Sequence, residues 1–318
     1  MVYSKLGKFL NDHRKPNNEQ GTHTHTIYDG KEFTGSYKVP QDKLDDFYKL
    51  LYKSIYQKND KISMVEKIQP TCRCVIDLDF KYKLQQDEKQ YNEKVLQTII
   101  LKIFDKFDEY YIMSSGQRVC WTMEKDQIAD GKSPYKSKDG IHLLFPHIIA
   151  DRKTYINVRK SLLDIDIHKI ISDEGFVPPS NNIDQVIDEA IYKNGNWFIY
   201  GCGKPNEELI YQLTNIYKVN PENTEITSQP MNLYEENPLE IMRMNSVSQH
   251  PSINVEYTDY LKSQQQFKKK KLSNSISSES IESLDYSNPE MIITKAQKYD
   301  LDVTKKLVDC LSVKLQHQ

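Results

Sequence analysis

The chain has 318 residues, of which 28% are charged and 38% hydrophobic, with a formal net charge of −2 and a mean hydropathy of −0.70. It contains neither a run of about 18 apolar residues that could cross a membrane nor an apolar signal core at its N-terminus. These features predict a soluble, intracellular protein with no membrane partner. Because the chain is not basic overall, any binding of phosphate must come from local clusters of cations.

The five cysteines, at positions 72, 74, 120, 202 and 310, contain no C-x-x-C pair. The spacing of Cys72 and Cys74 is too tight for a usual zinc knuckle, and no pair of histidines completes a set of four ligands. We therefore expect reduced thiols and no structural zinc.

The first third of the chain predicts short elements followed by alternating helices and strands. Residues 11–40 are polar and turn-rich, which indicates loops and short strands. A helix is expected to begin near Asp42 as its cap, since an apolar stripe follows at helical spacing. That stripe consists of Leu44, Phe47, Tyr48, Leu51 and Ile55. Residues 73–80 alternate and predict a strand, residues 90–111 predict a helix, and residues 118–123 predict another strand.

The next segments begin with a basic, turn-forming loop at residues 131–138. A short apolar strand over residues 140–146 is expected to follow and to end at Pro146. Residues 152–173 have the character of a helix.

Two short extended pieces, at residues 187–192 and 196–201, predict a hairpin that turns at Asn194-Gly195. Residues 208–219 predict a further strand. Helices and strands thus interleave to about residue 220, which indicates an α/β or α+β domain.

The composition changes near residue 255. Residues 256–288 are rich in serine, lysine and glutamine with few apolar residues, which predicts a flexible linker. The lysine run 268–271 fits a DNA contact or a nuclear signal, and equally a solvated run of charge. Residues 289–318 are amphipathic and are expected to be helical. The predicted organisation is therefore a domain over residues 1–255, the linker, and this helical segment.

Two carboxylates on one strand are the strongest chemical signal. Asp77 and Asp79 are two residues apart, so their side chains lie on one face of the expected strand and can share divalent cations. An alternative is a polar strand face whose acids pair with Lys81 or Arg73. A D-x-D pair alone is also typical of glycosyltransferases, phosphatases and nucleases.

A histidine follows on the strand at residues 140–146. Gly140 leaves room for a ligand beside the backbone, and His142 shares a face with Leu144. The preceding loop can cradle triphosphate oxygens with Lys132, Lys136 and Lys138. The alternative is a structural histidine with no role in a site.

A third group of residues spans positions 187–205, with Asp188 near its start and Lys204 after two glycines. The segment is not a Walker A motif, because the spacing and the following Ser or Thr are missing. Trp197 lies between them and suits either base stacking or core packing.

In this order, the three signals resemble the archaeo-eukaryotic primase superfamily, in particular the primase domains of primase-helicases from poxvirus-like and other large DNA viruses. The flanking segments agree over about residues 20–220. THTHTIYDGKEFTGSYKVP resembles the family's THT…GSY-x-I-P, VEKIQPTCRCVIDLDFKY its E-K…D-h-D-F segment, and WFIYGCGKP its W-L-M-Y-G-S-x-K-P.

The resemblance implies an α+β fold, with an archaeo-eukaryotic primase-like core built on a mixed or antiparallel, RRM-like sheet and a smaller N-terminal α/β portion. It implies a DNA primase or primase-polymerase that makes primers on single-stranded DNA from nucleoside triphosphates. The catalytic acids would be Asp77, Asp79 and Asp188, holding two Mg²⁺ or Mn²⁺ ions. His142 and Lys204 would bind the triphosphate, with Lys138 as an addition.

Asp184 is a rival for the third acid, but only Asp188 has the family's D-x-x-(I/V)-Y continuation. Two positions depart from cellular relatives, which carry S-x-H where this chain has Gly140 and an arginine where Phe198 or Ile199 stands. TKKLVDCLS, residues 304–312, resembles the segment that leads to a helicase domain, which implies a helicase domain or subunit as partner. A viral protein of this kind would act in the host-cell cytoplasm.

Two alternatives of other classes remain. One is a different D-x-D metal enzyme, such as a nuclease or a glycosyltransferase. The other is a non-catalytic, primase-like module that binds DNA or serves in assembly.

Overall fold

The computed structural model describes residues 4–16, 23–28, 33–205, 207, 210–220, 225–230, 237–248 and 255–259. Residues Met1–Thr258 form one compact unit. The predicted linker, apart from its first four residues, and the predicted helical segment 289–318 lie outside the described residues. None of the helices in these ranges is long and apolar enough to cross a membrane.

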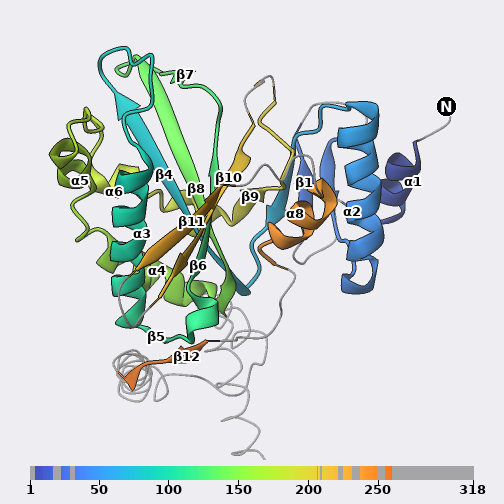
Figure 1. The fold of residues 1–318 in the computed structure, drawn as a ribbon. Helices are drawn as coiled ribbons and strands as arrows, with labels where there is room; N and C mark the ends of the chain where they lie inside the picture. The colour runs from blue at the N-terminus through green and yellow to red at the C-terminus, as the bar shows by residue number, and fades with distance from the viewer. Residues whose placement is uncertain are drawn as a thin grey trace, which may run out of the picture. The chain divides into compact units, whose positions relative to one another are not determined.

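A large antiparallel sheet forms the centre of the described part. Its strands are β4 (Thr71–Tyr82), β6 (Val119–Glu124), β7 (Ala129–Asp130), β8 (Ser137–Asp151), β10 (Gln212–Val219) and β11 (Ile226–Pro230). Their order is β11-β10-β6-β8-β4, and the short β7 pairs with β8 (Figure 1). The two long strands β4 and β8 pair along most of their length, which gives the site its rigid base.

A smaller sheet is built mostly from the N-terminal part of the chain. Its strands are β1 (His25–Ile27), β2 (Gly35–Tyr37), β3 (Met64–Lys67) and β9 (Asn196–Phe198), in the order β2-β1-β3-β9. A third pair joins β5 (Tyr111–Ile112) to β12 (Glu256–Tyr257). Every strand pairing among the described residues is antiparallel. The predicted α+β class with an antiparallel sheet is therefore confirmed.

The helices cover the two sheets. They are α1 (Lys5–Asp12), α2 (Leu44–Tyr52), α3 (Glu93–Asp108), α4 (Arg152–Leu162), α5 (Ile167–Asp173), α6 (Ile183–Val186), α7 (Ala190–Asn194) and α8 (Pro238–Met244). Short turns of other helix types are η1 (Gln41–Lys43), η2 (Lys53–Gln57) and η3 (Ser115–Gln117). Helices α3 and α4 lie along the large sheet, and α2 and α8 lie beside the small one (Figure 1).

The apolar face of the large sheet packs against α3. The rings of Phe104 and Phe107 stack edge-on against Phe145 of β8, at 5.4 and 4.9 Å between centroids. Since side chains alternate along a strand, Leu143 shares the face of Phe145, and the opposite face carries His142. The helix-covered face is thus the core, and the other face is left for polar chemistry.

Most predicted elements are found, although several boundaries and one predicted hairpin differ. The helix at residues 44–55 corresponds to α2 and η2, but Asp42 makes no capping hydrogen bond. Residues 152–173 form two helices, α4 and α5, because Asp166 caps a new start by accepting from the Lys169 N–H.

Pro146 does not end its strand, and that prediction is wrong. β8 continues to Asp151 because the pairing with β4 shifts at a bulge, where Cys74 faces Phe145 and Arg73 faces Ile149. A bulge tolerates a residue without an N–H group, and the carbonyl of Pro146 accepts a hydrogen bond from Arg73 Nε at 3.1 Å.

The predicted hairpin at residues 187–201 is also wrong. Residues Ala190–Asn194 form the short helix α7, and β9 pairs with β3 rather than with its chain neighbour. Asn-Gly is a hairpin signal, but the same dipeptide suits the end of a helix. Gly195 serves here as that cap, with φ +63°.

The segment after α8 is fixed to the two sheets by a buried pair of charges. Glu66 of β3 accepts hydrogen bonds from the Ser246 hydroxyl (2.8 Å), the Val247 N–H (2.9 Å) and the Ser248 N–H (3.1 Å). Arg73 of β4 donates to the carbonyl of Ser246 (2.5 Å) and makes further bonds to neighbouring carbonyls. Both side chains are buried, and most of these bonds are made away from water.

Candidate active site

The polar face of β4 and β8 brings two predicted site residues directly together. In the strand pairing Asp77 faces His142 and Asp79 faces Gly140. The Asp77 Oδ1 and His142 Nε2 atoms are 3.7 Å apart. The acidic pair and the histidine, separated by more than 60 positions in the sequence, therefore share one surface of the sheet.

Asp188 reaches this surface because its segment runs along the outer edge of β4. The Ser180 N–H donates to the Lys81 carbonyl at 2.7 Å, Ile187 forms a bridge with Leu78, and the Asp188 N–H donates to the Asp77 carbonyl at 3.0 Å. The Asp188 carboxylate accepts a hydrogen bond from the Ala190 N–H at 2.8 Å. Backbone pairing, rather than the predicted hairpin, places the third acid beside the first.

Asp184, the rival third acid, has a structural contact instead. Its Oδ1 accepts from Arg159 at 2.9 Å, and its carboxylate is 64% exposed. Arg159, which is buried in α4, also donates to the Ile187 carbonyl at 3.0 Å. This arginine holds the turn that precedes Asp188, so the contact of Asp184 with Arg159 helps to position Asp188.

Lysines surround the acids. Asp79 forms ion pairs with Lys81 (3.0 Å) and Lys138 (2.9 Å), so the alternative pairing of Asp79 with Lys81 does occur. Of the three loop lysines, only Lys138 lies within ion-pair distance of an acid among the described residues. Lys204 is half-exposed, and burial and the charge of Lys138 lower its pKa, which places these two cations near each other.

The pKa values of Asp77 and His142 are both shifted by burial and by the charges around them. Burial, followed by the charges of Asp79 and Asp188, raises the pKa of Asp77 from 3.8 to about 7. Burial and the nearby charges of Lys125, Lys204 and Lys138 hold the pKa of His142 well below its usual 6.5. The histidine is therefore neutral, and three acids and three lysines lie within electrostatic reach of one another.

Two aromatic rings hold His142 in place. Tyr211 stacks on its imidazole at 3.5 Å between centroids and 19° between planes, and Trp197 lies against it at 4.4 Å. Lys125 lies 5.3 Å from the centre of the Tyr211 ring. Sequence reasoning missed Tyr211 and Lys125, because neither belongs to a recognisable motif. Trp197 packs against the histidine.

Gly140 is required by the position of Tyr211. A Cβ atom at residue 140 would lie 2.9 Å from the Tyr211 hydroxyl and 3.0 Å from the Leu78 carbonyl oxygen. Cellular relatives carry a serine at the corresponding position of S-x-H, whereas here a tyrosine hydroxyl fills the space that a serine side chain would enter. The departure is thus a coupled pair of residues, Gly140 and Tyr211.

This coupling predicts a double-mutant result. Gly140→Ser is expected to lower the free energy of unfolding by about 1–3 kcal/mol, because the added atoms overpack the site. Tyr211→Phe, which removes the hydroxyl, should restore part of that loss when combined with it, because the contact with the Leu78 carbonyl remains. Urea denaturation of the two single variants and the double variant measures the coupling. Strictly additive losses would contradict this packing.

The acids suit a hard divalent cation by ligand type, since carboxylate oxygens are the ligands that Mg²⁺ and Mn²⁺ prefer. A cavity of about 350 Å³ beside them is lined by residues that include Asp79 and Asp188. Within the described ranges, no three His, Cys, Asp or Glu side chains are already arranged around a common metal position. Asp79 is instead neutralised by two ammonium groups. The raised pKa of Asp77 reflects its burial first and then the repulsion from Asp79 and Asp188, which a cation would relieve.

Comparisons with known proteins agree with this geometry. Residues 24–217 match the family model described as the C962R protein N-terminal AEP domain, AEP being the archaeo-eukaryotic primase superfamily. The chain is 25% identical over 197 residues to "Putative helicase L207/L206" of Acanthamoeba polyphaga mimivirus, covering 61% of this chain and 20% of the relative. It is 24% identical over 227 residues to "Putative helicase 184R" of Invertebrate iridescent virus 6, covering 64% and 22%.

The chain spans about a fifth of the length of each of these two relatives. The family match covers more than half of this chain, and it includes the candidate site residues from Asp77 to Tyr211. The chain therefore belongs to the archaeo-eukaryotic primase superfamily, as a primase-type domain of the family found in large DNA viruses.

Proposed function

We propose that this chain is a DNA primase or primase-polymerase, which joins nucleotides on a single-stranded DNA template by metal-dependent nucleotidyl transfer. The convergence of Asp77, Asp79 and Asp188 beside the neutral His142 is the observation that carries the proposal. Two of these acids lie on the rigid strand β4, the third lies beside its edge, and a group of lysines lies near them. The acids would form a cation-binding side of the site and the lysines a phosphate-binding side.

The proposed reaction is attack of a 3′-hydroxyl, from a primer or an initiating nucleotide, on the α-phosphate of an incoming nucleotide, with pyrophosphate leaving. Asp77, Asp79 and Asp188 would hold two Mg²⁺ or Mn²⁺ ions, which lower the pKa of the hydroxyl and neutralise developing charge when bound. The site would then exchange the two lysine contacts of Asp79 for a cation, freeing Lys138 to bind phosphate.

His142, Lys204 and Lys138 would hold the triphosphate. Because His142 is neutral, it can offer one N–H to a phosphate oxygen, while the lysines provide charge. Lys125 would add a further positive charge to this triphosphate-binding group, since its charge acts on His142. Tyr211 and Trp197 would keep the imidazole plane fixed as the nucleotide binds.

The proposed partners are a single-stranded DNA template, nucleoside triphosphates and a helicase domain or subunit. Both relatives carry a helicase name and are much longer than this chain, which supports a primase domain acting together with a helicase part. Their viral sources support the host-cell cytoplasm as the place of viral primer synthesis.

Incubation with single-stranded DNA, labelled ribo- or deoxyribonucleotides and Mg²⁺ or Mn²⁺ tests the proposal on a denaturing gel. The wild type is expected to make short products, and Asp77→Ala/Asp79→Ala is expected to make none. Product from both proteins, or from neither while both bind DNA equally, would contradict the catalytic proposal.

A second candidate is a primase-like module that binds DNA without catalysis. The two lysine contacts of Asp79 favour it, because they satisfy the carboxylate without any metal ion. Such a module would bind single-stranded DNA with a strong dependence on salt. Its affinity for nucleotide would also be unchanged by Asp77→Ala, whereas the catalytic proposal expects a loss.

A further inference from the structure

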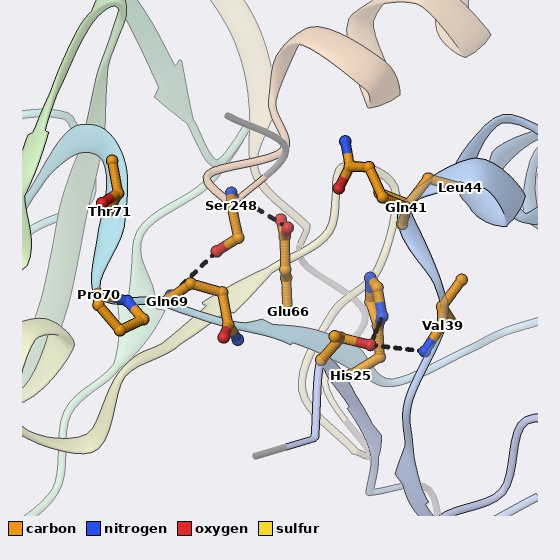
Figure 2. A pocket seen from close by; sticks show the side chains of 10 residues that line it. His25, Val39, Gln41, Leu44, Glu66, Gln69, Pro70, Thr71 and Ser248 are labelled. Carbon is orange, nitrogen blue, oxygen red and sulfur yellow. Dashed lines mark hydrogen bonds between the residues drawn. The ribbon is translucent and has the colours of Figure 1, made fainter. Parts of the chain in front are cut away.

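A second cavity, of about 350 Å³, lies at the small sheet and is not lined by Asp77, Asp79 or Asp188. Figure 2 shows its walls, which come from β1, the connection before α2, the segment after β3, and Ser248. Its size is at the lower end of the range for pockets that bind small organic groups.

A buried hydrogen-bonding atom points into this cavity without a partner. His25 is 1% exposed, and its Nδ1 atom lies 2.9 Å from the Thr24 hydroxyl oxygen. That hydroxyl donates to the Tyr37 carbonyl (3.2 Å) and accepts from the Val39 N–H (2.9 Å), so Nδ1 carries the proton of the imidazole. The Nε2 atom is left as an acceptor with no partner, and it points between Gln41 and Glu66 in Figure 2.

The lining suits a neutral, planar group. Val39, Leu44 and Pro70 supply apolar surface, and Gln41 and Gln69 supply amides. None of the lining residues is a lysine or an arginine, so the cavity offers no charge to hold a phosphate.

Two titratable residues of the lining do not change this conclusion. Glu66 is the one acid there, and its oxygens already accept from residues 246–248. Burial lowers the pKa of His25 to about 3, which keeps its ring uncharged.

Cations lie beside the cavity rather than in it. The Arg152 N–H donates to the carbonyl of the lining residue Pro70 at 2.8 Å, and its guanidinium donates to the Ile68 carbonyl at 3.3 Å. A Cβ atom at Gly195 would lie 3.0 Å from Arg152 Nη1 and 3.4 Å from Lys67 Nζ, so these two cations lie together. A neutral hollow with cations beside it is the arrangement by which proteins bind an unpaired base and its backbone phosphates.

We propose that this cavity binds a nucleobase of the single-stranded DNA template, with a base N–H donating to His25 Nε2 and the strand's phosphates beside Lys67 and Arg152. The inference rests on the proposed function, since it assigns the template strand to a second site. The two sites are joined through the small sheet, because Glu66 pairs with Trp197 of β9 and Trp197 packs on His142.

Fluorescence anisotropy with two labelled strands, one intact and one of abasic residues, tests the proposal by binding alone. Two variants fill the cavity from opposite walls, Gln41→Trp and Thr71→Phe, so that one remains informative if the other does not fold. Gln97→Trp on α3 is the matched control, because it adds the same side chain outside the cavity.

The wild type and Gln97→Trp are expected to bind the intact strand about tenfold more tightly than the abasic strand, as one buried base contributes. The folded cavity variants should lose most of that preference while keeping their affinity for the abasic strand. An unchanged preference in these variants overturns the proposal.

Adding free nucleoside triphosphate separates the two kinds of occupant. If it abolishes the wild-type preference for the intact strand, the cavity binds the free nucleotide and not a base of the template strand. If the wild type binds neither strand, the proposed function fails together with this site, whereas primer synthesis with an unchanged base preference leaves only this site refuted.

Discussion

Asp77→Asn is expected to abolish nucleotidyl transfer and, in the same protein, to raise the stability of the metal-free fold at neutral pH. Loss of one carboxylate that would hold the catalytic cations should lower the rate by on the order of 10³-fold or more. The gain in stability arises because Asp77 is buried to the point of being only 24% exposed, and because the charges of Asp79 and Asp188 also disfavour its ionised form.

The sign of the pH dependence follows from the raised pKa. Asp77 binds its proton more tightly in the folded protein than in the unfolded chain, so wild-type stability falls as the pH rises from 3.8 to about 7. The full cost, on the order of 2–4 kcal/mol, is present above pH 7 and absent below the unfolded pKa. Asparagine has no such cost at any pH.

Urea denaturation in the presence of a chelator, at about pH 8 and about pH 4, measures this difference. Asp77→Asn should exceed the wild type at the higher pH and match it at the lower pH. Asp87→Asn, at an exposed turn, is the matched control and should change neither stability nor activity. An Asp77→Asn protein that loses activity and also loses stability at both pH values would contradict the crowding of the acids.

Glu66→Ala is expected to cost on the order of 3–5 kcal/mol of unfolding free energy. The substitution leaves the Val247 and Ser248 N–H groups buried without their acceptor. It also leaves the buried Arg73 without its nearby countercharge. The loss should release the segment after α8 from both sheets.

The free energy of unfolding from urea titration tests this prediction. Glu88→Ala is the control, because Glu88 is exposed and the same change there should cost less than about 0.5 kcal/mol. Native-state hydrogen exchange should show faster exchange at residues 246–248 in Glu66→Ala. A cost below about 1 kcal/mol would mean that these bonds are replaced by water.

The parts of the site that sequence predicted are those set by local periodicity. Asp77 and Asp79 fall two residues apart in an apolar run, so the pleat of β4 places them on one face wherever the strand pairs. The same rule orients His142 on β8. The helices at residues 44–55 and 90–111 follow equally from their apolar stripes.

The parts that sequence did not predict depend on long-range placement. The family resemblance alone implies Asp188 as a site residue. Its position beside Asp77 depends on residues 180–188, which run along the edge of β4, and no local pattern predicts that edge. Asn194-Gly195 is ambiguous, since the dipeptide suits a hairpin or a helix end, and the pairing of β9 with β3 decided between them. Tyr211 became visible only as the neighbour of Gly140 and His142.

Primer synthesis by a matched pair of variants, Asp188→Asn and Asp184→Asn, tests whether Asp188 is the third carboxylate of the catalytic site. Both residues line the same cavity and differ by four positions, but only the backbone of Asp188 is hydrogen-bonded to Asp77. Asp188→Asn is expected to make no product on single-stranded DNA. Asp184→Asn is expected to retain synthesis when its rate is compared per folded protein, because this variant loses only the Arg159 contact. Synthesis by Asp188→Asn at the wild-type rate would contradict a three-carboxylate catalytic site.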